Sequence, residues 1–131
     1  MNIKLPFLTS TVCAGFPSPA DDYIEDNLDL NKFLIKQKDS TFFMKVEGDS
    51  MKDLGIFSGN ILIIDRSIKN FDHKVVVVVL NGEFTVRTFM KKDGRVFLVP
   101  GNRKYKAVEI VEGMDFEVWG VVTTVLNKFK S

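Results

Sequence analysis

The stretch VVVVVLNGEFTVRTFM, residues 75–90, decides the fold class. It begins with an apolar, largely β-branched run of strand length, which is typical of a strand buried on both faces. Asn81-Gly82 follows, and this dipeptide favours a two-residue hairpin turn because both residues tolerate a positive φ. Residues 83–90 then supply the returning strand. The stretch therefore predicts a β-hairpin in a mainly β protein.

Shorter stretches on both sides of this hairpin also have strand patterns. Residues 41–47 change to a period of two, and Asp93-Gly94 marks a second turn. The twelve Phe residues of the chain add to the β character. Many short strands separated by turns predict a compact β fold. The remaining strand candidates are residues 61–64, residues 95–99 and residues 116–126, the last as one long strand or a pair.

The N-terminal residues differ from this pattern. Residues 1–20 contain Pro6, Pro17 and Pro19 and show neither a helical nor a strand period. Prolines favour an extended chain around them. We therefore expect an extended N-terminal arm over residues 1–20 and a globular domain over residues 21–131.

Two short helices are predicted after the arm. The first opens at Asp21-Asp22, since Asp is a suitable N-cap residue. The second runs from Asp29 through Ile35, where apolar residues recur at helical spacing.

Composition limits the possible functions. The 131 residues fit one domain, and 18 Lys and Arg face 17 Asp and Glu. This near-neutral balance argues against direct sequence-specific DNA binding but not against work on DNA through a protein partner. With one cysteine, Cys13, and one histidine, we expect no disulfide, no metal site and no cofactor. No apolar stretch reaches the roughly 18 residues of a membrane helix, so we expect no membrane association and a cytoplasmic protein.

One turn has the chemistry of a nucleophile site. Gly48-Asp49-Ser50 taken alone is an ordinary turn, but it follows directly on a predicted strand. A turn in that place can present the Ser50 hydroxyl beside exposed backbone N–H groups, which are the donors that an oxyanion needs.

Several blocks in this order resemble the LexA/UmuD family of self-cleaving serine peptidases, and the similarity covers the chain from about residue 12 to its end. The Ser50 turn opens the first block. Residues 15–20 (GFPSPA) and Asp22-Tyr23 resemble the UmuD branch in particular. The blocks are residues 46–65, residues 82–87, Val99-Pro100 with Asn102 and Tyr105, and residues 120–122.

The resemblance implies a fold and a mechanism. The fold is the compact β fold of the LexA/UmuD C-terminal domain. Ser50 is the nucleophile position, and it attacks a bond in the N-terminal arm of its own protein. A lysine on a neighbouring strand, held neutral by desolvation, takes the serine proton. The cleaved bond follows a small residue and precedes glycine, which implies Ala14-Gly15 here.

Position 87 departs from the family pattern. The family's lysine base falls there, and this chain has Arg87. A guanidinium does not lose its proton in proteins, so Arg87 cannot act as a base. Lys91 and Lys92 lie about 13 Å further along a strand, and His73 is interpreted as a solvated turn residue. Three explanations remain open, namely an engineered block on cleavage, a natural loss of activity, or a local slip in the alignment.

The resemblance also implies partners. Fourteen residues before the proposed cut are too few for the DNA-binding domain of a repressor, so a UmuD-like accessory protein of SOS mutagenesis fits best. Such a protein is a homodimer, cleaves itself on a RecA–single-stranded DNA filament, and then joins a UmuC-like translesion polymerase. Two classes stay open: a self-cleaving serine peptidase, or a cleavage-dead dimer that regulates a polymerase or a partner peptidase subunit.

Other polar residues have simpler interpretations. Glu83 and Asp65 are read as surface or hydrogen-bonding groups, and Trp119 as a core or dimer-contact residue. A group of basic residues is read as a solvated face rather than a nucleic-acid patch. These residues are Lys91, Lys92, Arg95, Arg103, Lys104 and Lys106.

Overall fold

The structure is a computed structural model, and it describes residues 3–8, 11–16 and 25–130. The chain forms two compact units, Met1–Lys36 and Gln37–Ser131. The boundary predicted at residue 20 lies outside the described residues.

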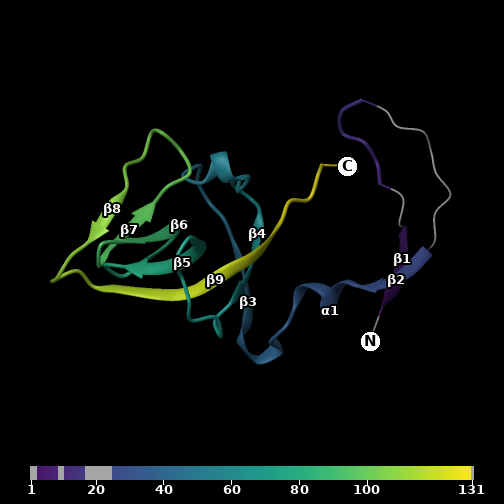
Figure 1. The fold of residues 1–131 in the computed structure, drawn as a ribbon, viewed down its shortest axis with the longest axis horizontal. Helices are drawn as coiled ribbons and strands as arrows, with labels where there is room; N and C mark the ends of the chain where they lie inside the picture. Colours follow the sequence, from purple (N-terminus) through teal and green to yellow (C-terminus); the bar gives the residue numbers. More distant parts are fainter. Residues whose placement is uncertain (1–2, 9–10, 17–24, 131) are drawn as a thin grey trace. The chain divides into compact units, whose positions relative to one another are not determined.

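The smaller unit is a two-stranded ribbon followed by one helical turn (Figure 1). β1 (Lys4–Leu8) pairs antiparallel with β2 (Glu25–Asp29), and Pro6 lies opposite Asn27. Sequence periodicity did not predict β1. A two-stranded ribbon leaves one edge of each strand open, and a proline is tolerated on such an edge.

Helix α1 (Leu30–Leu34) confirms the helix predicted from Asp29 to Ile35. The carboxylate of Asp29 caps it by accepting hydrogen bonds from the backbone N–H groups of Asn31 (3.1 Å) and Lys32 (3.4 Å). The helix predicted to open at Asp21-Asp22 falls on residues 17–24, which lie outside the described ones.

The larger unit is built on one antiparallel sheet, and the prediction of a compact, mainly β fold is confirmed. The strands lie in the order β3-β4-β9-β5-β6-β7-β8. A short 3-10 turn, Lys38–Ser40, precedes the first strand of this unit, and a second one, Lys52–Leu54, follows that strand. The strands are β3 (Thr41–Lys45), β4 (Ile61–Asp65), β5 (Lys74–Leu80), β6 (Glu83–Lys92), β7 (Arg95–Val99), β8 (Val108–Ile110) and β9 (Phe116–Leu126).

Both predicted hairpin turns are present. Asn81 and Gly82, with φ of 50° and 84°, join β5 to β6. Asp93 and Gly94, with φ of 53° and 75°, join β6 to β7. Positive φ at both central residues gives the turn a twist that matches antiparallel strands, which explains why these dipeptides stand there.

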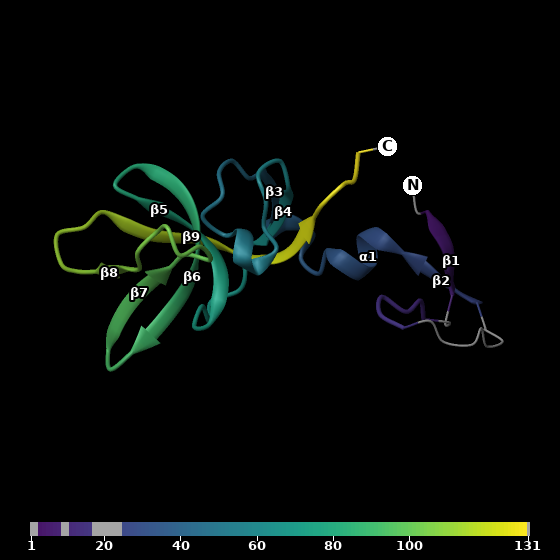
Figure 2. The same cartoon turned by 90° about the horizontal axis from the view of Figure 1, so that it is seen from above.

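Strand β9 is one continuous strand in the interior of the sheet. It pairs with β4 on one side and with β5 on the other, and Figure 2 shows β9 beside β5 from above. The sequence allows one long strand or a pair over residues 116–126, and the structure has one. β5 pairs with the first half of β9, Phe116–Val121, and β4 pairs with the second half, Val121–Leu126, so β9 joins the two parts of the sheet.

The apolar core lies on both faces of β5. Val77 packs in one cluster with Met51 and Leu62, while Val76 and Val78 pack in a second cluster. Successive residues of a strand point to opposite faces, so the valine run is buried on both, as its composition predicted. The first cluster lies beneath the turn that carries Ser50, and thereby ties that turn to the sheet.

Candidate active site

A closed loop after β3 carries Ser50. The backbone N–H of Val46 donates to the carbonyl of Asn60 (2.8 Å), and that of Gly59 donates to the carbonyl of Val46 (2.8 Å). The Met51 side chain, 1% exposed, anchors the loop in the core. Ser50 therefore stands between a strand end and a buried side chain, which restricts its backbone.

A second loop, after β7, holds the same turn from the other side. The N–H of Gly101 donates to the carbonyl of Ser50 (2.7 Å), and the N–H of Asp53 donates to the carbonyl of Gly101 (2.7 Å). A Cβ on Gly101 would stand 3.2 Å from the Cα of Met51. This close backbone approach favours glycine at position 101, since a larger residue would have to displace its neighbours.

Asp49 is fixed by two side chains of that second loop. The amide of Asn102 donates to the Asp49 carbonyl (2.9 Å), and the hydroxyl of Tyr105 donates to Asp49 Oδ1 (2.7 Å). The hydrogen bond from Tyr105 lowers the pKa of Asp49, and the same bond raises the pKa of Tyr105. The residue before Ser50 is thus held at both its backbone and its carboxylate.

Arg87, on β6, contacts the serine directly. Its Nη1 donates to Ser50 Oγ (2.7 Å) and to the carbonyl of Val86 (2.7 Å). The guanidinium carbon lies 5.9 Å from the centre of the Tyr105 ring. Burial lowers the pKa of Arg87 from its usual value, but a guanidinium remains charged across the pH range of proteins.

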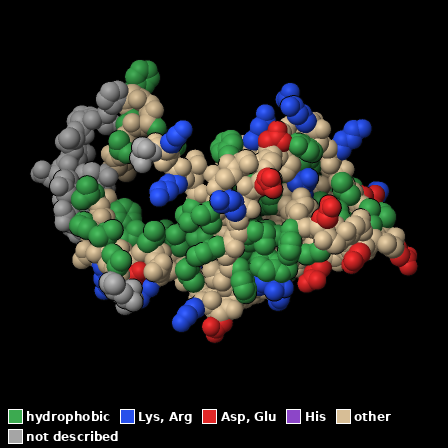
Figure 3. Space-filling view, turned by 180° about the vertical axis from the view of Figure 1, so that it is seen from behind, with side chains coloured by type: hydrophobic (Ala, Val, Ile, Leu, Met, Phe, Trp, Pro, Cys, Tyr) green, Lys and Arg blue, Asp and Glu red, His purple; other side chains and the backbone are tan. Residues whose placement is uncertain are grey.

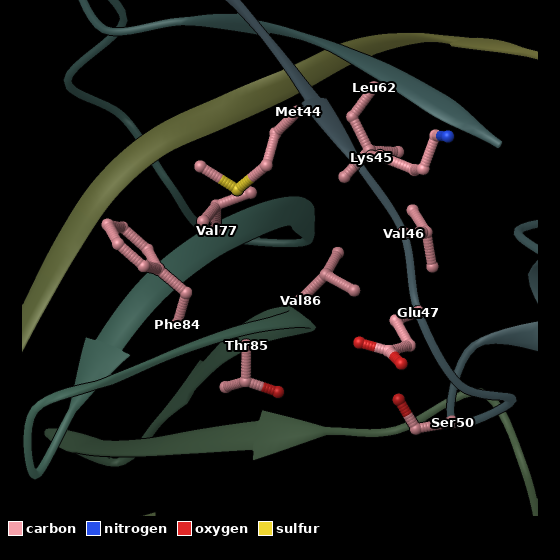
Figure 4. Close-up of a pocket in the computed structure, with 10 residues that line it drawn as sticks. All are labelled: Met44, Lys45, Val46, Glu47, Ser50, Leu62, Val77, Phe84, Thr85 and Val86. Atoms are coloured by element: carbon pink, nitrogen blue, oxygen red, sulfur yellow. The ribbon is translucent and has the colours of Figure 1, made fainter. Parts of the chain in front are cut away.

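A cleft of about 280 Å³, lined by both apolar and polar side chains, leads to Ser50. Figure 4 shows Ser50 at one end of it, with the Glu47 carboxylate pointing toward the serine. The walls come from β3, β4, β5, β6 and the turn after β3, and they combine six apolar residues with four polar or charged ones. They are formed by Met44, Lys45, Val46, Glu47, Ser50, Leu62, Val77, Phe84, Thr85 and Val86.

At the end of this cleft, Ser50 accepts a hydrogen bond from the cationic side chain of Arg87. Residues 6–123 match the family model described as Peptidase S24-like. The chain belongs to the Peptidase S24-like family.

Its similarity to individual S24-like proteins extends over almost the whole chain. It is 39% identical over 126 residues to Protein SamA of Salmonella typhimurium, covering 96% of this chain and 87% of SamA. It is 35% identical over 121 residues to Protein MucA of Escherichia coli, covering 92% and 82%. The LexA repressor of Pseudarthrobacter chlorophenolicus is 34% identical over 120 residues, covering 92% of this chain and 47% of the repressor. SamA and MucA are UmuD-like members of the LexA/UmuD family, and this likeness supports an accessory role in SOS mutagenesis.

The two residues that the S24-like pattern joined, Ser50 and Arg87, are in contact. Lys91 and Lys92, considered as replacements for the base, are exposed near the far end of β6. His73 is also exposed, with a φ of 63° and its Nδ1 3.1 Å from Asp72 Oδ1. Within the described part of the chain, Arg87 is the one cationic side chain hydrogen-bonded to Ser50.

The proposed cleavage site is in the smaller unit. Ala14 and Gly15 form part of a bend after β1, and both are exposed. An exposed bend without strand pairing suits a bond that a peptidase must reach, since its backbone groups are not committed to a sheet.

The remaining polar candidates have structural surroundings. Asp65 accepts hydrogen bonds from the hydroxyls of Ser40 (3.1 Å) and Ser67 (2.6 Å), while Glu83 is exposed at the start of β6. The six basic residues read as a solvated face are all exposed. Among the described residues, no helix has the length and apolar character needed to cross a membrane.

Sequence reasoning missed three contributors to the site. The Gly101 backbone, the Tyr105 hydroxyl and the Glu47 carboxylate were not identified as neighbours of Ser50. The third family block contains Asn102 and Tyr105, and its presence was the one sequence feature that could have pointed to the second loop as part of the site. Nothing in a single sequence indicates that residues more than 50 positions apart share a hydrogen bond, as Tyr105 and Asp49 do.

Proposed function

We propose that this chain is a UmuD-like accessory protein of SOS mutagenesis, built to cut its own Ala14-Gly15 bond with Ser50. Arg87 makes this form slow or inactive in cleavage. The observation that carries the proposal is the 2.7 Å hydrogen bond between Arg87 Nη1 and Ser50 Oγ. It places a permanently charged donor where the family has a base.

The chemistry of the pair explains the expected loss of rate. A serine hydroxyl is a weak nucleophile unless a neighbouring group removes its proton. A lysine at position 87, half-buried beside the cleft, would lose its own proton readily and could accept that of Ser50. Arg87 can only donate, so it orients the hydroxyl without activating it.

The wider role includes partners. A homodimer in the cytoplasm would meet the RecA–single-stranded DNA filament as its cleavage activator and a UmuC-like translesion polymerase as its working partner. The likeness to SamA and MucA supports this assignment. No direct sequence-specific DNA binding is required, which agrees with a net charge of +1.

Exposed aromatic side chains support the dimer. Phe42 and Phe84 are 43% and 56% exposed, and their rings lie 5.3 Å and 5.8 Å from the Trp119 ring. Figure 3 shows exposed hydrophobic side chains on the larger unit among charged ones. Contiguous apolar surface of this kind marks protein interaction sites.

A second candidate function is a cleavage-dead dimer that regulates a polymerase or a partner peptidase subunit. Arg87 favours it, because a chain that cannot activate Ser50 still keeps its fold and its surface. The two candidates differ in one measurable respect, namely whether residues 1–14 are released.

The deciding experiment compares the unchanged chain, Arg87→Lys, and Arg87→Lys with Ser50→Ala. Each purified protein is incubated alone and with an activated RecA filament, and the fragment of residues 1–14 is measured by mass spectrometry. We expect release from Arg87→Lys alone, faster than from the unchanged chain by on the order of 10²–10⁴-fold, the usual contribution of a general base.

Two outcomes would contradict the proposal. Equal release from the unchanged chain and from Arg87→Lys would mean that the base lies elsewhere. Release that persists after Ser50→Ala would mean that Ser50 is not the nucleophile. The absence of release from all three proteins would favour the second candidate function.

A further inference from the structure

Arg87 is a half-buried cation that forms no ion pair with an acidic residue in the part of the chain that the structure describes. The ion pairs among the described residues join Arg66 to Glu117, His73 to Asp72, and Arg95 to Glu109. Buried or partly buried charges in proteins are normally paired, because desolvation penalises an isolated charge. Among the described residues, the Arg87 guanidinium beside Ser50 therefore lacks the directly paired carboxylate that such a position usually has.

The Arg87 guanidinium has further N–H donors besides those of Nη1. In the described part of the chain, both hydrogen bonds of Arg87 come from Nη1, and neither Nε nor Nη2 has an acceptor. Among the described residues, neither is a fully buried polar atom that lacks a partner. Nε–H and Nη2–H form the planar fork that matches the two oxygens of a carboxylate.

Ser50 adds a third donor. Its Oγ accepts from Arg87 Nη1, which leaves its own hydrogen free to donate. An anion at this point can therefore receive hydrogen bonds from both the serine and the arginine. A neutral amide has one carbonyl oxygen and would use fewer of these donors.

The cleft restricts what can bring such an anion. Its walls include the apolar side chains of Met44, Leu62 and Val86 and end at Ser50, and its volume of about 280 Å³ fits a few small side chains. One wall is β3, an outer strand of the sheet that pairs only with β4 among the described strands. Extended peptides bind beside such edges through their main chain while alternate side chains enter apolar pockets.

We propose that Ser50 and Arg87 form a receptor for the C-terminal carboxylate of a peptide whose preceding residues lie in the cleft. The occupant is a peptide with a free carboxyl end, such as a chain ending at Ala14. The proposal concerns binding, and it holds whether or not the chain cuts itself.

Arginine suits this role better than lysine. In a desolvated place an ammonium loses its proton and, with it, its attraction for a carboxylate, whereas a guanidinium stays charged. The same substitution that removes a base therefore creates a permanent anion site.

Glu47 opposes the bound anion. It lines the same cleft, its carboxylate points toward Ser50 in Figure 4, and it forms no ion pair with Arg87 among the described residues. A second carboxylate brought to this point is repelled by it. Removing the charge of Glu47 should therefore strengthen binding, which gives the test a variant of opposite sign.

The experiment uses the full chain and two synthetic peptides of the sequence LTSTVCA, residues 8–14, labelled at the N-terminus and kept reduced. One peptide ends in a free carboxylate and the other in an amide, and fluorescence anisotropy gives both affinities. We expect the acid to bind about 10-fold or more tightly than the amide, the usual advantage of hydrogen bonds to a charged group.

Four variants locate the effect. Arg87→Met should abolish the preference for the acid, and Glu47→Gln should increase it severalfold. Arg103→Met removes an exposed arginine and serves as the matched control that should leave the preference unchanged. In Arg87→Lys the preference should be lost as the pH rises through the pKa of the lysine, whereas the unchanged chain should keep it.

Equal affinities of the acid and the amide for the unchanged chain would overturn the proposal, and this comparison needs no variant to fold. A preference that survives in Arg87→Met would overturn it as well. The result is separable from the cleavage experiment, since a chain that never cuts can show the preference and a chain that cuts can lack it.

Discussion

Arg87 Nη1 lies 2.7 Å from Ser50 Oγ, although 37 residues separate the two along the chain. The turn after β3 and the middle of β6 bring them together. One side chain at this point therefore determines whether the serine meets a proton acceptor or a proton donor.

The pH dependence of cleavage follows from this contact. In Arg87→Lys the neutral amine is the active form, and burial disfavours the charged form. The rate of release of residues 1–14 should therefore rise with pH until the lysine has lost its proton, and then level off. The unchanged chain should show no such rise, since the guanidinium keeps its proton. Mass spectrometry across a pH series checks this, and a matching rise in the unchanged chain would contradict it.

Tyr105 should position the serine through Asp49. Tyr105→Phe removes the hydroxyl that lowers the pKa of Asp49, so this pKa should rise back toward its usual value. Because the folded pKa lies below the unfolded one, the associated stability exists above the unfolded pKa and is lost as the pH falls through the folded pKa. A carboxyl-carbon NMR titration measures the change.

A control for this titration lies within the same protein. Glu109, whose pKa is lowered by Arg95, should titrate as before. In the Arg87→Lys background, Tyr105→Phe should also slow cleavage by about tenfold, the loss of one charge-assisted hydrogen bond. An unchanged cleavage rate together with a raised pKa of Asp49 would show that Tyr105 has only a structural role.

The exposed aromatic side chains should contribute to the dimer. Phe84→Glu places a charge beside Trp119 and should weaken self-association by about tenfold or more, because burying an unpaired carboxylate is costly. Val111→Glu changes a residue that is 50% exposed elsewhere and should have little effect. Sedimentation equilibrium at micromolar concentration measures both, and a monomeric unchanged chain would count against the dimer.

Gly120 should be required by packing rather than by chemistry. A Cβ at this position would stand 2.5 Å from Ile64 Cγ2 and 3.1 Å from Arg66 Cγ. Gly120→Ala should therefore lower the free energy of unfolding by about 1–3 kcal/mol. Glu117→Ala, at an exposed position of the same strand, should change it by less than about 1 kcal/mol. Denaturant titration distinguishes the two.

Local patterns predicted the parts of the fold that local forces dominate. The valine run and the Asn81-Gly82 turn specify a buried strand and a hairpin within a few residues of each other, and both are present. β1 escaped prediction because its pairing with β2 depends on a partner about 20 residues away and because Pro6 obscures its period.

The site shows the same division. The family resemblance identified Ser50 and position 87, because the family pattern includes both positions. The contacts of Gly101 and Tyr105 were missed, because a hydrogen bond across the fold leaves no periodic trace in the sequence. Such contacts depend on how the loop after β7 closes over the turn after β3, which only three-dimensional packing determines.

The position of the Ala14-Gly15 bond between β1 and β2 gives a single hydrolysis a large effect on the smaller unit. While the chain is intact, the connection holds the two strands together at an effective concentration of roughly millimolar. After a cut, β1 belongs to a free fragment, and a two-stranded ribbon has little stability of its own. Dilution would then dissociate β1 from Glu25–Asp29 and leave the backbone edge of β2 without its partner. Cutting one covalent bond would thus make the pairing of β1 with β2 depend on concentration. In a cell, the loss of this pairing would be irreversible.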